Sequence, residues 1–135
     1  MLLHARITNE ALVLMHESSL TLPQIVAMHV LRAEGPLPLS RLGDALGLST
    51  SATSSLVDRL VERQYASREE DPDDRRQKRV TLLGAGGAFV ERLAAARASE
   101  LSEGLTHVDP ALRAEMANIL EQVVAQLRRS KPTCS

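Results

Sequence analysis

A connection of only three residues, Gly47-Leu48-Ser49, separates two segments of helical periodicity. Glycine tolerates the left-handed backbone that often ends a helix, and serine is a favoured N-cap for the helix that follows. We therefore expect a short helix that Ser40 caps and that runs to about Leu46, and a second helix running to about Gln64. Two helices joined by so short a turn are typical of a helix-turn-helix unit.

The second of these helices has two different faces. Apolar residues recur at four-residue steps and predict a buried seam, which Thr53 and Val57 widen. The opposite face has short hydroxyl side chains at its N-terminal end, which would let the helix enter the major groove of duplex DNA, about 12 Å wide. The alternative is a solvated surface on an ordinary helical protein. The seam is Leu48, Ala52, Leu56 and Leu60, and the candidate DNA contacts are Ser49, Thr50, Ser51, Ser54, Ser55 and Arg59.

The segment that follows loses helical periodicity and predicts a β-hairpin. Ala66–Glu69 and Arg79–Leu82 are expected to form two short antiparallel strands around an acidic turn. A cluster of cations follows this turn, and long cationic side chains on such a loop can reach phosphates or the minor groove. The alternative is a charge run neutralised by the preceding acidic residues. The candidate DNA contacts here are Arg75, Arg76 and Lys78.

Asp74 lies immediately before these cations. Carboxylates and phosphates repel each other, so Asp74 is a poor candidate for a DNA contact. We expect it instead to orient the wing by a bidentate pair with the guanidinium of Arg76.

The rest of the chain is predicted to be helical. An N-terminal helix from about Leu2 to Glu17 precedes one that starts at Thr21-Leu22-Pro23-Gln24 and ends at Gly35-Pro36. Two long helices follow Gly84, the second restarting at Asp109-Pro110. Helical spacing predicts that the seam of the first consists of Phe89, Val90, Leu93, Arg97, Leu101 and Leu105. The expected fold is mainly α with a small β-hairpin: a winged helix-turn-helix flanked by N- and C-terminal dimerisation helices.

Composition narrows the class of partner. The formal net charge is −1, so positive charge for DNA binding must be concentrated locally. Aromatic residues make up 1% of the chain, only Tyr65 and Phe89, which argues against single-stranded nucleic acids gripped by stacking. No apolar run is long enough to span a bilayer and no signal peptide is apparent, so we expect a cytoplasmic protein.

No enzymatic chemistry is expected. The single cysteine, Cys134, excludes an intramolecular disulfide and a cysteine-based zinc site. A redox-sensing role is not expected for it, because no cationic pocket is apparent around it. The histidines show no i, i+4 pairing, so no metal site is expected. No Ser-His-Asp or paired-carboxylate arrangement is visible, and we expect neither catalysis nor a cofactor.

Several motifs together resemble the MarR (multiple antibiotic resistance regulator) family of winged-helix repressors. They are Leu22-Pro23-Gln24, the run from Leu42 to Ser49, Leu56-Val57-Asp58-Arg59-Leu60, and the wing sequence from Asp71 to Arg76 that continues to Val80-Thr81-Leu82. The resemblance covers nearly the whole chain.

The resemblance implies a single chain of residues 1–135, with a DNA-binding lobe over 21–83 and dimerisation helices over 1–18 and 84–130. It implies a homodimer that places two recognition helices in successive major grooves of a pseudopalindrome. It also implies an effector pocket between the dimerisation helices and the DNA-binding lobe, with lining residues and effector unknown.

The chain departs from the family pattern at three places, one of which is a first helix that is short for the family. Leu82-Leu83 lacks the threonine that usually caps the next helix, and Ser54-Ser55 stands where relatives often have Thr-Arg. Two hypotheses therefore remain: a ligand-responsive repressor that binds duplex DNA, and a winged-helix protein–protein module that has lost DNA binding.

Overall fold

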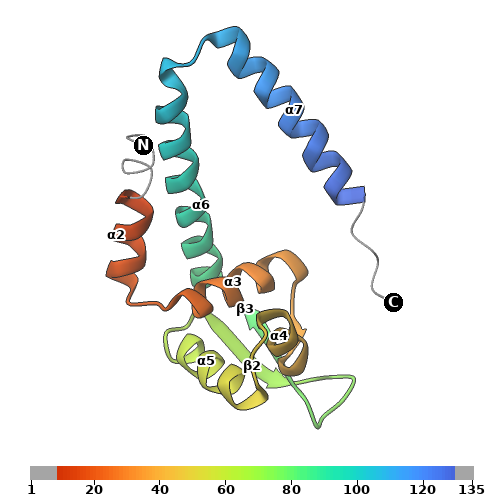
Figure 1. The fold of residues 1–135 in the computed structure, drawn as a ribbon. Coiled ribbons are helices and arrows are strands. Elements are labelled where there is room, and N and C mark those ends of the chain that lie inside the picture. The colour runs from red at the N-terminus through yellow and green to blue at the C-terminus, as the bar shows by residue number, and fades with distance from the viewer. Residues whose placement is uncertain (1–8, 130–135) are drawn as a thin grey trace.

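The computed structural model describes residues 9–129 and consists mostly of helices, with one small sheet (Figure 1). The predicted fold class, mainly α with a β-hairpin wing, is confirmed. The start of the expected N-terminal helix, residues 1–8, lies outside the described residues, as does Cys134. The elements are α2 (Asn9–Ser18), α3 (Leu22–Glu34), β1 (Leu37–Pro38), α4 (Leu39–Leu46), α5 (Thr50–Glu62), β2 (Ala66–Glu70), β3 (Lys78–Leu82), α6 (Gly84–Gly104), the 3-10 turn η1 (Leu105–His107) and α7 (Pro110–Arg129).

The lobe at the bottom of Figure 1 is built from α3, α4, α5 and the sheet. Its apolar side chains come from every one of these elements, so a single core fixes the helices relative to the wing. The largest fully buried side chains of this core are Met28, Leu31, Leu42, Thr53, Val57, Leu60 and Val80.

The ends of α3 follow the sequence signals. The N–H of Thr21 donates to Gln24 Oε1 at 2.8 Å, which is one half of the expected capping box. Gly35 ends the helix with φ 81°, a backbone conformation that glycine adopts without strain. The predicted cap of α4 is wrong: Pro38 is the N-cap and Leu39 the first helical residue, so Ser40 lies inside the helix.

The sheet has three antiparallel strands in the order β1-β3-β2. The two predicted wing strands are confirmed, with Ala66 paired with Leu82 and Glu70 with Lys78. The third strand was not expected, because a two-residue segment that contains Pro38 shows no alternation. It pairs with β3 and joins the start of α4 to the wing.

A long arm rises from the lobe (Figure 1). It consists of α6 with α2 packed along it, and α7 leads away from the far end of α6. The expected seam of α6 is correct at Phe89, Val90 and Leu93, but Arg97 and Leu101 are exposed. Ala96 and Glu100 are buried instead, because α2 lies against that side, where the Ala11 N–H donates to Glu100 Oε1 at 3.3 Å.

Candidate nucleic-acid interface

The turn between α4 and α5 has the predicted helix-turn-helix geometry. Gly47 adopts φ 65° and ψ 31°, the left-handed conformation that ends α4. Ser49 caps α5, accepting a hydrogen bond from the Ala52 N–H through its Oγ at 3.2 Å. A Cβ at Gly43 would lie 2.9 Å from Thr53 Oγ1, so only glycine lets the two helices approach this closely.

The two faces of α5 are divided almost as expected. Thr53, Leu56, Val57 and Leu60 are buried, whereas Ala52 is exposed and Leu48 only half-buried, which corrects the predicted seam. Ala52 lies in the first turn of α5 and faces solvent. Most of the candidate contacts face solvent, and Ser54 is half-buried. The exposed candidates on α5 and its cap are Ser49, Thr50, Ser51, Ser55 and Arg59.

The wing loop is held by an ion-pair cluster at its base. Arg79 Nε lies 3.0 Å from Asp71 Oδ2, and Arg79 Nη2 lies 3.2 Å from Asp73 Oδ2. The pKa of Asp71 is lowered, first by the hydrogen bond from the Asp73 N–H and then by the Arg79 guanidinium. Asp71 therefore stays ionised and keeps the two wing strands together where the loop begins.

Asp74 orients the wing differently from the prediction. Its Oδ1 accepts a hydrogen bond from the main-chain N–H of Arg76 at 3.0 Å, and its Oδ2 accepts one from Gln77 Nε2 at 3.3 Å. The expected pair with the Arg76 guanidinium is not formed, because the nearby carboxylate closes the tight turn through the main chain. The carboxylate shapes the loop and leaves the arginine side chain unpaired.

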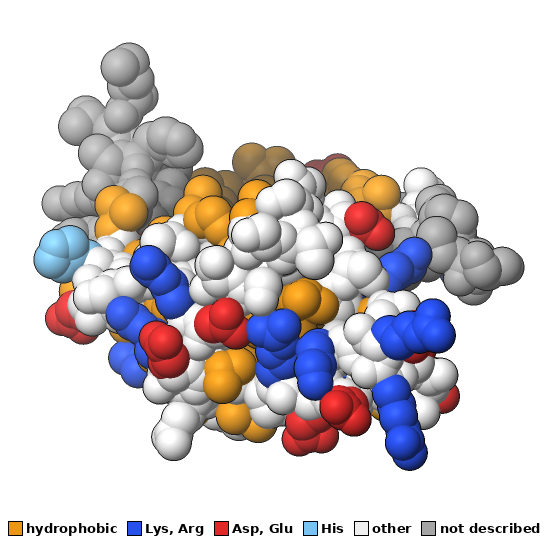
Figure 2. Space-filling model, turned by 90° about the horizontal axis from the view of Figure 1, so that it is seen from below, with side chains coloured by type: hydrophobic (Ala, Val, Ile, Leu, Met, Phe, Trp, Pro, Cys, Tyr) orange, Lys and Arg blue, Asp and Glu red, His pale blue; other side chains and the backbone are white. Residues whose placement is uncertain are grey.

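Three of the candidate DNA contacts are arginines with side chains unpaired within the described part of the chain. Within residues 9–129, the side chains of Arg59, Arg75 and Arg76 make no hydrogen bond or ion pair, whereas Lys78 lies 3.5 Å from Glu70. Figure 2 shows Lys and Arg side chains along this underside, with Asp and Glu side chains among them. The candidate cations on the wing tip are therefore free to meet phosphate, and Lys78 is partly neutralised.

Sequence reasoning missed one cation at this interface. Arg68 on β2 donates from Nη1 to Asp58 Oδ1 at 2.7 Å and to Ser54 Oγ at 3.0 Å. It occupies the side of α5 where Ser54 was expected to contact DNA. The only signal that could have located it is strand alternation, which places Arg68 on the same side of β2 as buried Ala66.

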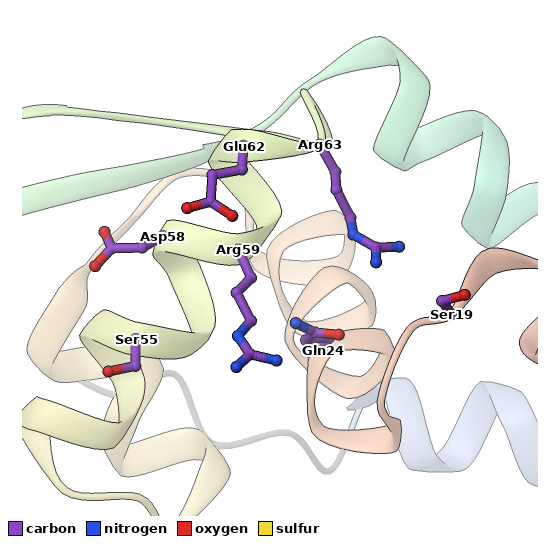
Figure 3. A pocket seen from close by; sticks show the side chains of 7 residues that line it. All are labelled: Ser19, Gln24, Ser55, Asp58, Arg59, Glu62 and Arg63. Atoms are coloured by element: carbon purple, nitrogen blue, oxygen red, sulfur yellow. The ribbon is translucent and has the colours of Figure 1, made fainter.

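A polar hollow of about 570 Å³ lies between α5 and the start of α3. Arg59 of α5 and Arg63, the residue that follows this helix, extend toward Gln24 and Ser19, whereas Asp58 extends to the other side of the helix (Figure 3). Arg63 Nη1 donates to the main-chain oxygen of Ser18 at the end of α2. The recognition helix is thereby tied to the arm as well as to the wing.

This geometry defines a winged helix-turn-helix protein: a capped recognition helix, a glycine turn and a cationic hairpin on one core. Residues 20–78 match the model of the MarR family, so this lobe is similar to the DNA-binding lobe of that family. The resemblance drawn from the sequence motifs is confirmed.

Curated relatives point to the same class of protein. One is the HTH-type transcriptional regulator YcgE of Bacillus subtilis, 39% identical over 64 residues, covering 47% of this chain and 42% of the relative. Another is the HTH-type transcriptional repressor NicR of Pseudomonas putida, 32% identical over 90 residues, covering 65% of this chain and 57% of the relative. The chain thus spans about half the length of these relatives. Both are described as regulators and neither as an enzyme.

Solved structures share the architecture of the arm as well as the lobe. The transcriptional regulator Tm0710 from Thermotoga maritima superposes with a TM-score of 0.80 at 21% identity, over 91% of this chain and 87% of that one. Bordetella bronchiseptica BpsR, whose DNA binding is described as regulated by 6-hydroxynicotinic acid, matches with a TM-score of 0.55 at 25% identity, over 90% of this chain and 96% of that one.

Residues 9–129 were compared with the requirements of two other kinds of structure, a metal-ion site and a membrane-spanning helix, and they meet neither. No group of three or more His, Cys, Asp or Glu side chains in residues 9–129 could hold a metal ion. Within the same range, no helix combines the length and apolarity needed to cross a membrane.

Proposed function

We propose that this protein is a transcription regulator that binds duplex DNA sequence-specifically as a homodimer, with α5 in the major groove and the wing tip against the backbone. The observation that carries the proposal is the pairing of an exposed, capped helix N-terminus with unpaired wing arginines on one side of one lobe. The helix provides short polar groups for base edges, and the arginines provide charge for phosphates.

The contacts divide between two surfaces. Ser49, Thr50 and Ser51 lie at the N-terminal end of α5, where free N–H groups favour phosphate. Arg75 and Arg76 lie on the hairpin and can follow the adjacent backbone. The remaining proposed contacts are Ser54, Ser55, Arg59 and Lys78.

The arm supports the homodimer. A row of apolar side chains along α7 is exposed in the single chain, although such a face is stable only when covered. A second copy would cover it and hold two recognition helices at a fixed spacing. The exposed row consists of Leu112, Met116, Ile119, Leu120, Val123, Val124 and Leu127.

The mode of regulation is proposed from relatives. NicR is described as a repressor, and the DNA binding of BpsR is described as regulated by a small pyridine acid. We infer that this chain is a repressor whose DNA affinity falls when a small ligand changes the spacing of its two recognition helices. A repressor of this kind would act in the cytoplasm.

The test is binding of the full chain to its own upstream DNA, measured by fluorescence anisotropy at several salt concentrations. Several phosphate contacts release counterions, so the affinity should fall steeply and linearly on a log–log plot, with a slope of about −0.9 per contact. An unrelated duplex of the same length is the control. Absence of binding at low salt to any duplex would contradict the proposal and favour a winged-helix protein–protein module.

A further inference from the structure

The Arg68 guanidinium lies across the solvent-facing side of the recognition helix. Arg68 comes from β2, yet its Nη1 bonds Ser54 and Asp58, which are one helical turn apart on α5. Its side chain is 26% exposed, against 56% for that of Asp58. The strand and the helix therefore fix this cation at the junction between wing and recognition helix, with part of its surface accessible.

Both of these hydrogen bonds use the same nitrogen. A guanidinium has five N–H donors in a rigid planar fork. The Nη2 and Nε donors of Arg68 make no hydrogen bond to any residue in the described range. They remain available to an acceptor that approaches α5, and a pair of parallel donors matches the O6 and N7 acceptors of guanine in the major groove.

The charge balance favours a base edge over a phosphate. Asp58 lies 2.7 Å from the guanidinium and offsets its charge, so the pair attracts a phosphate weakly. The same carboxylate holds the guanidinium in place, so the free N–H donors of the guanidinium keep a fixed direction. The pair is suited to discriminating among bases and not to adding overall affinity.

We propose that Arg68, positioned by Ser54 and Asp58, reads a guanine edge and is a specificity-determining residue of the DNA interface. It supplies from the wing strand the guanidinium that Ser54 and Ser55 do not provide. The proposal rests on the DNA binding proposed above and adds a residue that neither the helix-turn-helix motif nor the wing motif contains.

The experiment first selects a preferred duplex from a random library with the wild-type chain. Dissociation constants are then measured for that duplex and for a scrambled duplex, with Arg68→Lys and the matched control Arg32→Lys. Arg32 is also an arginine in an ion pair, 3.1 Å from Glu91 on α6.

Lysine keeps the charge and the pairing with Asp58 but lacks the planar fork, so Arg68→Lys should lower the preference for the selected duplex about 10-fold or more. Its salt slope and melting temperature should stay close to the wild-type values, and Arg32→Lys should leave the preference unchanged.

A second variant tests the charge balance. Asp58→Asn removes the carboxylate and leaves the cation unneutralised, so binding to the scrambled duplex should tighten and the salt slope should steepen by up to about 0.9. An unchanged slope would overturn the assignment of Arg68 to the DNA-facing surface.

The outcomes separate the two proposals. If the wild-type chain prefers its selected duplex and Arg68→Lys retains that preference, the role of Arg68 is overturned and the proposed function stands. If Arg68→Lys weakens both duplexes equally, Arg68 only docks the wing, and the role is again overturned. If the wild-type chain binds no duplex, the proposed function itself fails.

Discussion

Arg79 on β3 donates two hydrogen bonds to the buried carboxylate of Asp71, from Nε at 3.0 Å and from Nη2 at 3.3 Å. Asp71 also accepts the N–H of Asp73 at 2.9 Å, and its own N–H donates to the Gln77 oxygen at 3.0 Å. One side chain thus closes the loop that carries the wing arginines. The wing is a braced hairpin, and its shape depends on the charge of Asp71.

Asp71→Asn should loosen the wing without unfolding the lobe. The amide keeps the size of the side chain but loses the charge that pairs with Arg79, so the loop backbone should exchange hydrogen faster and DNA binding should weaken. Hydrogen exchange followed by mass spectrometry would measure the change, with Asp44→Asn as the control because Asp44 is exposed on α4. Equal exchange in wild type and Asp71→Asn would contradict the bracing role.

The same pair predicts a pH dependence of stability. The pKa of Asp71 is lowered below its ordinary value of 3.8 in the folded state. A carboxylate of this kind stabilises the fold above its unfolded pKa, and this contribution is lost as the pH falls through the folded pKa. In urea titrations, the free energy of unfolding of the wild type should therefore fall more than that of Asp71→Asn as the pH drops from about 5 to about 2. Equal decreases in the two proteins would show that Asp71 is not linked to folding.

Gly86 should be the glycine of α6 that tolerates substitution least. A Cβ there would run into the main-chain oxygen of Tyr65 and lie 2.7 Å from Leu82 Cδ1. Because a main-chain oxygen cannot move aside cheaply, Gly86→Ala should lower the free energy of unfolding by about 1–3 kcal/mol. Gly87→Ala is the matched control, since its Cβ would meet open space, and it should stabilise the helix by about 0.5–1 kcal/mol. Equal effects of the two alanines in urea titrations would show that the close contact at Gly86 is not required.

The parts of the fold that depend on local signals could be predicted from the sequence. Gly47 and Ser49 act through their own backbone and side-chain geometry, so the turn and the cap were both expected correctly. The second half of the α6 seam depends on what packs against it. Ala96 and Glu100 are buried by α2, which is remote in sequence, and periodicity alone placed the seam on Arg97 and Leu101.

In the candidate site, too, local signals could be predicted from the sequence and contacts between different elements could not. Motifs identified the wing arginines, because a charge run is visible along the chain. The contact between Arg68 and Asp58 joins residues ten positions apart on different elements, and only the packing of β2 on α5 brings them together. The predicted partner of Asp74 was wrong because a turn's main-chain N–H competes with side chains for a nearby carboxylate.

Arg76→Ala should weaken DNA binding more than Arg32→Ala. Arg76 is unpaired at the wing tip, whereas Arg32 pairs with Glu91 on α6, away from the wing. Loss of one phosphate contact should make the salt slope shallower by about 0.9. Anisotropy titrations of both variants across a salt series would measure this, and equal slopes for the two variants would contradict the placement of the wing on DNA.

Ile119→Glu should convert the protein to a monomer. Ile119 is 53% exposed in the middle of the apolar row of α7, and covering it with a second copy would bury the new carboxylate without a partner. Sedimentation at about 10 μM should give twice the chain mass for the wild type and the single-chain mass for Ile119→Glu. Ala125→Glu is the matched control, because Ala125 is exposed on the opposite side of the same helix and its substitution should leave the dimer intact. A wild-type chain that sediments as a monomer would exclude the homodimer, and equal dissociation by both variants would show that the apolar row is not the interface.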